Sequence, residues 1–226
     1  MKHNIAETNF LNAYHEAFNA LFRVSEKDLL TLYREDSYKG YPSTPGGSAY
    51  DSEMKALYCM IRLAQPKKIL EIGQYKGDSS NHILLAVERN GFGEVHLVDI
   101  QETMVQENLH NLNFTRHICD SLQFLNSNFL DFDFIAQDGC HLAPHVTKEL
   151  QLLKSKNMND FHIWSHDYFA PQTPAVNVRA AWNAEGATFA QVLPCVNRDE
   201  VKILQNEGHP VELCGVVLGH FIREEP

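Results

Sequence analysis

From residue 67 onward, short apolar runs alternate with longer segments of helical spacing, and this alternation restricts the possible folds more than any other feature. The apolar runs predict strands at 67–72, 94–99, 114–119, 132–136 and 161–164. Helical patterns follow them, and two longer runs without a helix between them lie at 188–193 and 211–221. Five strand–helix units followed by a strand pair predict a doubly wound α/β fold. We expect a mainly parallel seven-stranded sheet, covered by helices on both faces, with an antiparallel edge.

The first 47 residues follow a different pattern. Phe10, Tyr14 and Phe18 stand four residues apart and predict a helix over 8–23, and leucines at 29–32 predict a second, shorter helix. Glycine, proline and serine then dominate residues 40–48, which is typical of turns. We therefore expect a helical appendage and linker at 1–47 and a main domain at 48–226, which starts with a helix at 50–64. An apolar face on the first helix would suit a homodimer.

Composition excludes several classes of protein. The 19 basic and 29 acidic residues give a formal net charge of −10, which disfavours nucleic acid as a partner. No apolar run approaches the roughly 20 residues that cross a bilayer, and the first residues lack the apolar core of a signal peptide. The five cysteines are odd in number and form no CxxC pair. We expect a cytoplasmic protein with reduced thiols and no membrane partner.

Ligands of doubly wound sheets bind outside the carboxyl ends of the strands, so the residues after each strand are the candidates. After the first strand, Gly73 and Gly77 permit a sharp turn and a close approach of the backbone to a ligand. Their spacing is neither that of the GxGxxG dinucleotide motif nor that of a phosphate-binding loop. The same residues also suit an ordinary strand-to-helix turn, in which Asp78 or one of the two serines after it caps the helix.

Acidic residues end the next two strands. Asp99 follows Gly77 by 22 residues, a position from which a carboxylate can accept hydrogen bonds from both hydroxyls of a ribose. Asp120 and Ser121 follow the third strand and could meet the amino group of an adenine. Each of these residues is equally suited to cap the helix that follows it.

The fourth and fifth strands end in the most informative residues of the chain. Asp138 and His141 follow the fourth strand, and His166 and Asp167 follow the fifth. Because these two strands are expected to be neighbours, we predict that the four side chains share one cleft. Carboxylates and imidazoles there could bind a divalent cation, and one histidine could act as a general base. The alternative is that they are ordinary solvated residues of surface loops.

Read together, these motifs resemble the class I S-adenosylmethionine-dependent methyltransferases over about residues 50–222. Ile69-Leu70-Glu71-Ile72-Gly73-x3-Gly77-x-Ser79-Ser80 is similar to the cofactor loop of the O-methyltransferase branch. The segments 138–141 and 166–168 resemble the macrocin-type and mycinamicin-type sugar O-methyltransferases, with cephalosporin-hydroxylase-like proteins nearby. The resemblance implies the Rossmann-like methyltransferase fold.

The resemblance also implies a role for each residue. S-adenosylmethionine would be bound by Glu71, Gly73, Gly77, Ser79, Asp99, Asp120, Ser121 and Asp138. A magnesium ion or a similar divalent cation would be held by Asp138, His166 and Asp167, and His141 would be the catalytic base. An acidic residue is more usual in this family at the position of His166.

The expected reaction is the metal-assisted O-methylation of a small hydroxylated molecule, such as a sugar or a polyketide. A hydroxyl with a pKa near 10 is a poor nucleophile at neutral pH, so an ion that lowers this pKa and a base that takes the proton would both help. Two alternatives stay open. One is a methyltransferase-like binding scaffold without activity, because His166 replaces an acidic residue. The other is a dinucleotide-dependent oxidoreductase, which the absence of GxGxxG disfavours.

Overall fold

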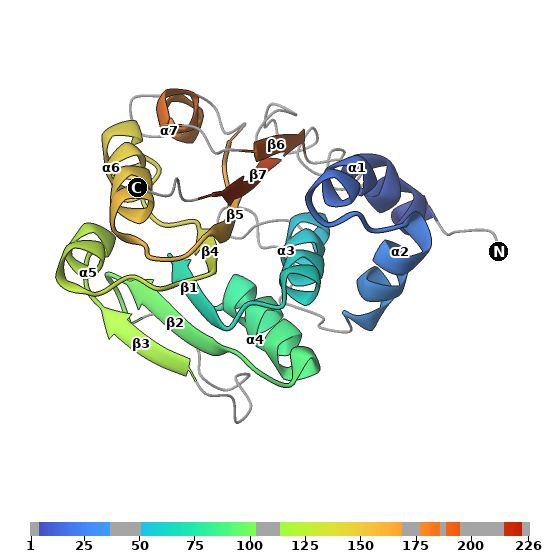
Figure 1. The fold of residues 1–226 in the computed structure, drawn as a ribbon, viewed down its shortest axis with the longest axis horizontal. Helices are drawn as coiled ribbons and strands as arrows, with labels where there is room; N and C mark the ends of the chain where they lie inside the picture. Colours follow the sequence, from blue (N-terminus) through green and yellow to red (C-terminus); the bar gives the residue numbers. More distant parts are fainter. Residues whose placement is uncertain are drawn as a thin grey trace.

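In the computed structural model, the residues described are 5–36, 51–102, 114–168, 177–185, 189–194 and 215–222. They form one seven-stranded sheet in the order β3-β2-β1-β4-β5-β7-β6 (Figure 1). The strands are β1 (Lys68–Ile72), β2 (Glu94–Asp99), β3 (Phe114–Ile118), β4 (Phe134–Gln137), β5 (Phe161–Ser165), β6 (Phe189–Pro194) and β7 (Gly215–Phe221). The helices are α1 (Ile5–Phe22), α2 (Glu26–Glu35), α3 (Asp51–Ala64), α4 (Asp78–Asn90), α5 (Ser121–Ser127), α6 (Ala143–Lys156) and α7 (Val178–Glu185).

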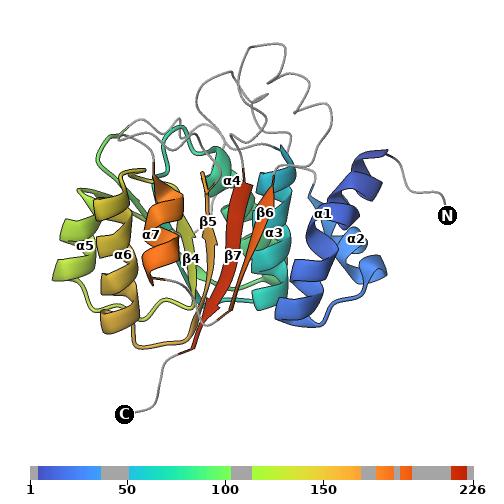
Figure 2. The same cartoon turned by 90° about the horizontal axis from the view of Figure 1, so that it is seen from above.

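The strand directions confirm the fold predicted from the sequence. The first five strands pair in parallel, and β7 is antiparallel to both of its neighbours, β5 and β6. Figure 2 shows β7 running against the strands beside it. Six strands therefore point one way, and their carboxyl ends meet at one edge of the sheet. The turn-rich segment at 40–48 and the first residues of the last predicted strand, 211–214, lie outside the described residues.

Helices cover both faces of the sheet because successive residues of each strand point to opposite sides. Phe134 of β4 and Trp164 of β5 point into a core shared with α3 and α4. Their neighbours Ile135 and Ile163 point into a second core, shared with α5, α6 and α7. Near-continuous apolar strands are what a sheet buried on both faces requires.

The two N-terminal helices form an outer layer against α3 (Figures 1 and 2), and α1 also contacts the sheet at β6 and β7. Tyr14 and Phe18 of α1 are fully buried in the same core as Leu57 of α3. The apolar face that suggested a homodimer is therefore buried within the chain, and the homodimer stays a prediction without that support. The division of the chain at residue 48 also stays a prediction.

Two further expectations concern single features. Within the described part of the chain, no helix is long and apolar enough to cross a membrane. Among the same residues, Cys59, Cys119 and Cys140 carry free thiols, as the odd and scattered cysteines suggested.

Candidate functional site

The loop after β1 packs directly on the end of β4. Gly73 has a φ of +87°, in the left-handed region that favours glycine. A Cβ atom at this position would overlap the backbone of Asp138 and Gly139, so no other residue fits without moving one of the two segments. The Gly73 amide donates to the carbonyl of Val98 at 2.9 Å, and the Asp138 amide donates to the carbonyl of Ile72 at 2.8 Å. The glycine predicted to allow a close approach therefore brings the first loop against the end of β4.

The start of α4 differs from the prediction. The N-cap is Gly77, which has a φ of +86° and no capping side chain, so the expectation that Asp78 or a serine caps this helix is wrong. The hydroxyls of Ser79 and Ser80 donate instead to the carboxylate of Glu71. Burial raises the pKa of Glu71 to about 7, although both serine hydrogen bonds oppose this shift. The hydrogen bond between Ser79 and Glu71 thus connects the first turn of α4 to β1, across the base of the first loop.

Asp99 ties together the two loops that follow β1 and β2. Its Oδ2 accepts a hydrogen bond from the amide of Tyr75 at 2.8 Å, and its Oδ1 accepts one from the amide of Gln101 at 2.9 Å. A carboxylate has about four lone-pair sites, so each oxygen can accept one more hydrogen bond. The place predicted for a ribose-binding carboxylate is therefore held rigidly and keeps free acceptor capacity.

At the end of β3, the structure shows the helix-cap alternative. Asp120 is the N-cap of α5, and its Oδ1 accepts hydrogen bonds from the amides of Leu122 and Gln123. Ser121 is 7% exposed, and its hydroxyl donates to Glu149 at 2.5 Å, beside the Nε2 of His145 at 2.8 Å. Its hydroxyl therefore already has partners inside the protein.

The four residues predicted at the ends of β4 and β5 do come together. The two strands are parallel neighbours, with Gln137 beside Ser165. His141 Nε2 lies 3.4 Å from Asp138 Oδ1 and 3.2 Å from Asp167 Oδ2. His166 Nδ1 lies 3.2 Å from Asp138 Oδ1 and 3.2 Å from Asp167 Oδ1. Two carboxylates therefore face two imidazoles in one cluster.

The charges in this cluster reinforce one another. Burial opposes a charge on His166, but the carboxylates around it outweigh burial and raise its pKa well above the usual value. A hydrogen bond to Asp138 raises the pKa of His141, with Asp167 adding to the effect. Burial acts to raise the pKa of Asp138, but His166 and His141 prevail and lower it. Asp167 has a φ of +60°, in the left-handed region that residues with a side chain rarely adopt, although aspartate adopts it more readily than most.

The donor atoms of the cluster suit a divalent cation. One atom each from Asp138, His141 and Asp167 lies within 4.8 Å of the others. Neighbouring ligands around an octahedral ion with bonds of about 2.1 Å stand about 3 Å apart, close to the separations of 3.2 and 3.4 Å seen here. The sequence assigned His166 to the metal and His141 to the base, whereas the group with this ligand spacing contains His141 instead of His166. Nδ1 of His166 nevertheless lies 3.2 Å from an oxygen of each of the same two carboxylates.

A sequence comparison identifies this part of the chain. Residues 70–168 match the family model of a methyltransferase domain, and every residue predicted for the site lies within that range. This central segment of the chain is therefore similar to a methyltransferase domain. No curated protein sequence matches the chain significantly.

Solved structures of methyltransferases share the fold of this chain. An O-methyltransferase from Bacillus cereus in complex with SAH is 15% identical, with a TM-score of 0.57 over 92% of this chain and 96% of that chain. The O-methyltransferase TomG from Streptomyces achromogenes, involved in tomaymycin synthesis and bound to SAM, is 14% identical, with a TM-score of 0.58 over 92% and 95%. The N-methyltransferase NodS from Bradyrhizobium japonicum, bound to SAH, is 11% identical, with a TM-score of 0.56 over 86% and 97%. At these identities the likeness shows the fold alone.

Two buried glutamates next to the predicted site were not predicted. Glu53 of α3 contacts His166, and Glu149 of α6 contacts Gln137, which precedes Asp138. Both carboxylates are completely buried. Glu149 had a detectable signal, because it occupies a core-facing position between Val146 and Leu150. Glu53 had none, since its contact joins residues 113 positions apart.

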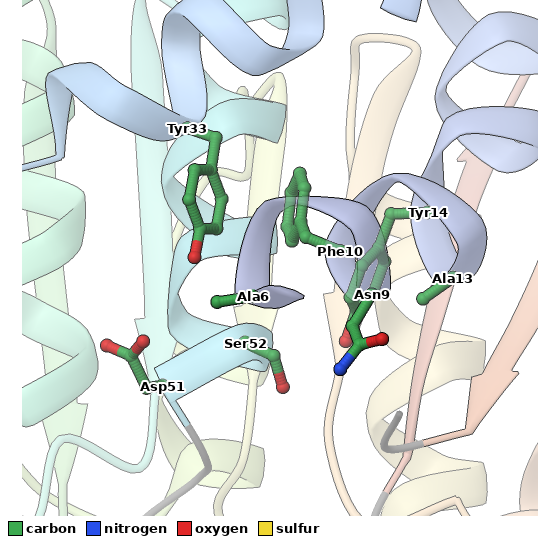
Figure 3. A pocket seen from close by; sticks show the side chains of 8 residues that line it. All are labelled: Ala6, Asn9, Phe10, Ala13, Tyr14, Tyr33, Asp51 and Ser52. Atoms are coloured by element: carbon green, nitrogen blue, oxygen red, sulfur yellow. The ribbon is translucent and has the colours of Figure 1, made fainter. Parts of the chain in front are cut away.

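A small pocket lies outside the residues that match the family model, between α1, α2 and the start of α3 (Figure 3). Phe10 and Tyr14 of α1, Tyr33 of α2 and Ser52 of α3 are among the side chains that line it. None of the residues predicted to bind a cofactor or an ion lines this pocket. The cluster at the ends of β4 and β5 is therefore the stronger candidate for the functional site.

Proposed function

We propose that the protein transfers a methyl group from S-adenosylmethionine to a hydroxyl oxygen of a small molecule, with help from a divalent cation. One observation carries the proposal: two carboxylates and two imidazoles converge at the ends of β4 and β5, where the Gly73 loop packs. The B. cereus and S. achromogenes O-methyltransferases, which share the fold, bind SAH and SAM. The fold brings the cofactor loop and the cluster to the same edge of the sheet, as in-line methyl transfer requires.

The cofactor would lie along the carboxyl edge, over β1 and β2. Gly73 and Gly77 would let the backbone approach it closely, and the spare acceptor capacity of Asp99 would receive the ribose hydroxyls. Glu71 and Ser79 would act by shaping the loop, because they bond to each other beneath it. Asp120 and Ser121 would border the adenine at the start of α5.

Asp138, Asp167 and His166 would hold the ion, which is Mg²⁺ or a similar divalent cation. When bound, such an ion lowers the pKa of an acceptor hydroxyl and orients its oxygen. The αL conformation of Asp167 keeps its carboxylate directed at the cluster. His166 is 8% exposed, and its Nε2 contacts the buried carboxylate of Glu53.

His141 would be the general base. Its side chain is 34% exposed, more than those of the other three residues of the cluster, so it is the member of the cluster most accessible to an acceptor. A base must be unprotonated to accept a proton, and the neighbouring carboxylates raise the pKa of His141. The methyl transfer rate should therefore rise with pH as His141 loses its proton. General-base help of this kind typically contributes about 10²–10⁴ in rate.

The test is methyl transfer from labelled S-adenosylmethionine to a panel of small sugars, phenols and polyketides. We expect transfer to at least one hydroxylated compound, its loss on chelation, and its recovery when Mg²⁺ or Mn²⁺ is added back. Transfer that survives chelation would contradict the role of the ion. Cofactor binding without transfer to any acceptor would favour the inactive scaffold, and no cofactor binding would overturn the whole proposal.

A further inference from the structure

The ring of His166 is fixed on two sides by residues outside the predicted site. Its Nε2 lies 3.1 Å from Oε2 of Glu53, a completely buried carboxylate on α3. The indole of Trp164 stacks on the imidazole, with the ring centroids 5.6 Å apart and the planes 14° apart. Glu53 therefore sets which nitrogen of His166 points away from the core, and Trp164 sets the plane of the ring.

The orientation that Glu53 imposes has a consequence for the other nitrogen. A carboxylate only accepts hydrogen bonds, so Nε2 of His166 carries the hydrogen that Glu53 receives. Nδ1 is then directed at Asp138 Oδ1 and Asp167 Oδ1, both 3.2 Å away. Two carboxylate oxygens and an imidazole lone pair repel one another unless a cation lies between them. In the protein without an ion, a proton on Nδ1 can provide this positive charge. A bound metal ion would replace the proton, and Nδ1 would then be one of its ligands.

We propose that Glu53 is a positioning residue that holds His166 as a nitrogen ligand, and that the site therefore binds Mn²⁺ in preference to Mg²⁺. This inference rests on the proposed function, because it assumes that the cluster binds a divalent cation. Magnesium prefers oxygen ligands, whereas ions of the first transition row also accept imidazole. The hydrogen bond from a ligating histidine to a carboxylate fixes the ring and makes it a better donor. Losing such a partner typically weakens metal binding by about 10–100-fold.

The position of Glu53 separates this role from simple packing. A completely buried carboxylate is costly unless it is hydrogen-bonded or paired. Glu53 lies in the first turn of α3, where a negative charge also interacts favourably with the helix dipole. Glutamine would fill the same space and could still accept a hydrogen bond from Nε2, but it carries no charge. A series from glutamate through glutamine to alanine at position 53 therefore distinguishes orientation and charge from filling of space.

The experiment measures the dissociation constants of Mn²⁺ and Mg²⁺ by titration calorimetry on the full chain, with Mn²⁺ also followed by electron paramagnetic resonance. The variants are Glu53→Gln, Glu53→Ala and His166→Asp. Glu7→Gln is the matched control, because Glu7 is also a buried glutamate of the N-terminal half and pairs with Arg34, away from the cluster. Circular dichroism and thermal melting report whether each variant is folded.

We expect the wild type and Glu7→Gln to bind Mn²⁺ at least about 10-fold more tightly than Mg²⁺. Glu53→Ala should weaken Mn²⁺ binding by about 10–100-fold, and Glu53→Gln by less, because glutamine keeps the acceptor. His166→Asp should reduce the preference for Mn²⁺, since it replaces the nitrogen by oxygens. A purely structural role of Glu53 would change the melting temperature without changing the ratio of the two dissociation constants.

Equal affinity of the wild type for both ions would overturn the inference, as would a folded Glu53→Ala variant that binds Mn²⁺ like the control. Both results leave the proposed function intact, because an ion still binds. If the wild type binds SAH but neither ion, the inference and the ion in the proposed function fail together. If Glu53→Ala does not fold, Glu53→Gln and His166→Asp decide the matter.

Discussion

Two completely buried glutamates approach the carboxyl edge of the sheet from opposite faces, and their surroundings differ. Glu149, on α6, lies 2.5 Å from the hydroxyl of Ser121, 3.0 Å from the side-chain amide of Gln137 and 3.2 Å from Nε2 of His145. Glu53, on α3, lies against His166, a member of the predicted site. The same residue type at the same burial therefore bonds to Ser121 and Gln137 on one face and to the cluster at the ends of β4 and β5 on the other.

The network around Glu149 continues along the strand ends. Gln137 accepts a hydrogen bond from the hydroxyl of Ser165, which accepts one from Nε1 of Trp182 at 3.0 Å. Ser121, Gln137 and Ser165 are sequence neighbours of Asp120, Asp138 and His166 and point to the face of α5, α6 and α7. These hydrogen bonds therefore fix the carboxyl ends of β4 and β5 on the side of α6 and α7.

The largest difference between the two faces should appear in catalysis. We expect His141→Ala to lower kcat by about 10²–10⁴-fold, because the transferred proton loses its acceptor, and to leave the dissociation constant of SAH unchanged. The control is His145→Ala, which removes a partly buried histidine from the Glu149 side. Steady-state kinetics of both variants test this, and equal losses in the two would remove the distinction between the faces.

The next effect concerns stability on the α6 side. Glu149→Ala leaves the buried donors of Ser121 and Gln137 without their acceptor, so we expect it to lower the free energy of unfolding by about 4 kcal/mol. Urea denaturation measures this loss. Methyl transfer per folded molecule at saturating S-adenosylmethionine should stay close to that of the wild type, since Glu149 contacts Ser121, Gln137 and His145 and none of the four residues of the β4–β5 cluster. A stable variant with much reduced transfer would show that Glu149 acts in the reaction.

Glu71 is a third buried glutamate in this comparison. The hydroxyls of Ser79 and Ser80 donate to its carboxylate, but they carry no positive charge that would offset its burial. Its pKa of about 7 in the folded protein lies above the ordinary value of 4.5. The folded state then binds more protons than the unfolded state between these values, so stability should fall by up to about 3 kcal/mol as pH rises from 4.5 to 7. Glu71→Gln should flatten this part of the stability curve. An unchanged pH dependence in denaturant titrations of the variant would contradict the shift.

The smallest expected effect involves His162, which stacks on Phe22 of α1 and on His220 of β7. Burial lowers its pKa to about 4. Below its ordinary value of 6.5, the unfolded state takes up a proton that the folded state refuses, so stability is lost on acidification. We expect a cost of about 2 kcal/mol between pH 6.5 and 5. His162→Phe should remove it, and equal acid sensitivity of variant and wild type would argue against this origin.

The sequence predicted the residues that meet at the strand ends, but not the contacts that fix them from the two faces of the sheet. Parallel strands end at one edge, so the residue after each strand sufficed to predict that Asp138, His141, His166 and Asp167 meet. The choice between two hydrogen-bond partners was not predictable in the same way. Ser79 and Ser80 suited a helix cap, but they donate to Glu71 instead, because a buried carboxylate needs donors. The contact of Glu53 depends on how α3 lies on the sheet, which no local pattern encodes.

The central claim is that the loop after β1 and the carboxylate of Asp99 bind an adenosyl sulfonium cofactor beside the β4–β5 cluster. Titration calorimetry of the purified protein with SAH tests it most directly, with Asp99→Ala as the variant and Asp131→Asn, a partly exposed aspartate paired with Lys68, as the control. We predict one binding site in the wild type and the control, and at least about a 10-fold weaker site in Asp99→Ala. A folded wild type that binds no SAH, or an Asp99→Ala variant that binds it equally well, would contradict the claim.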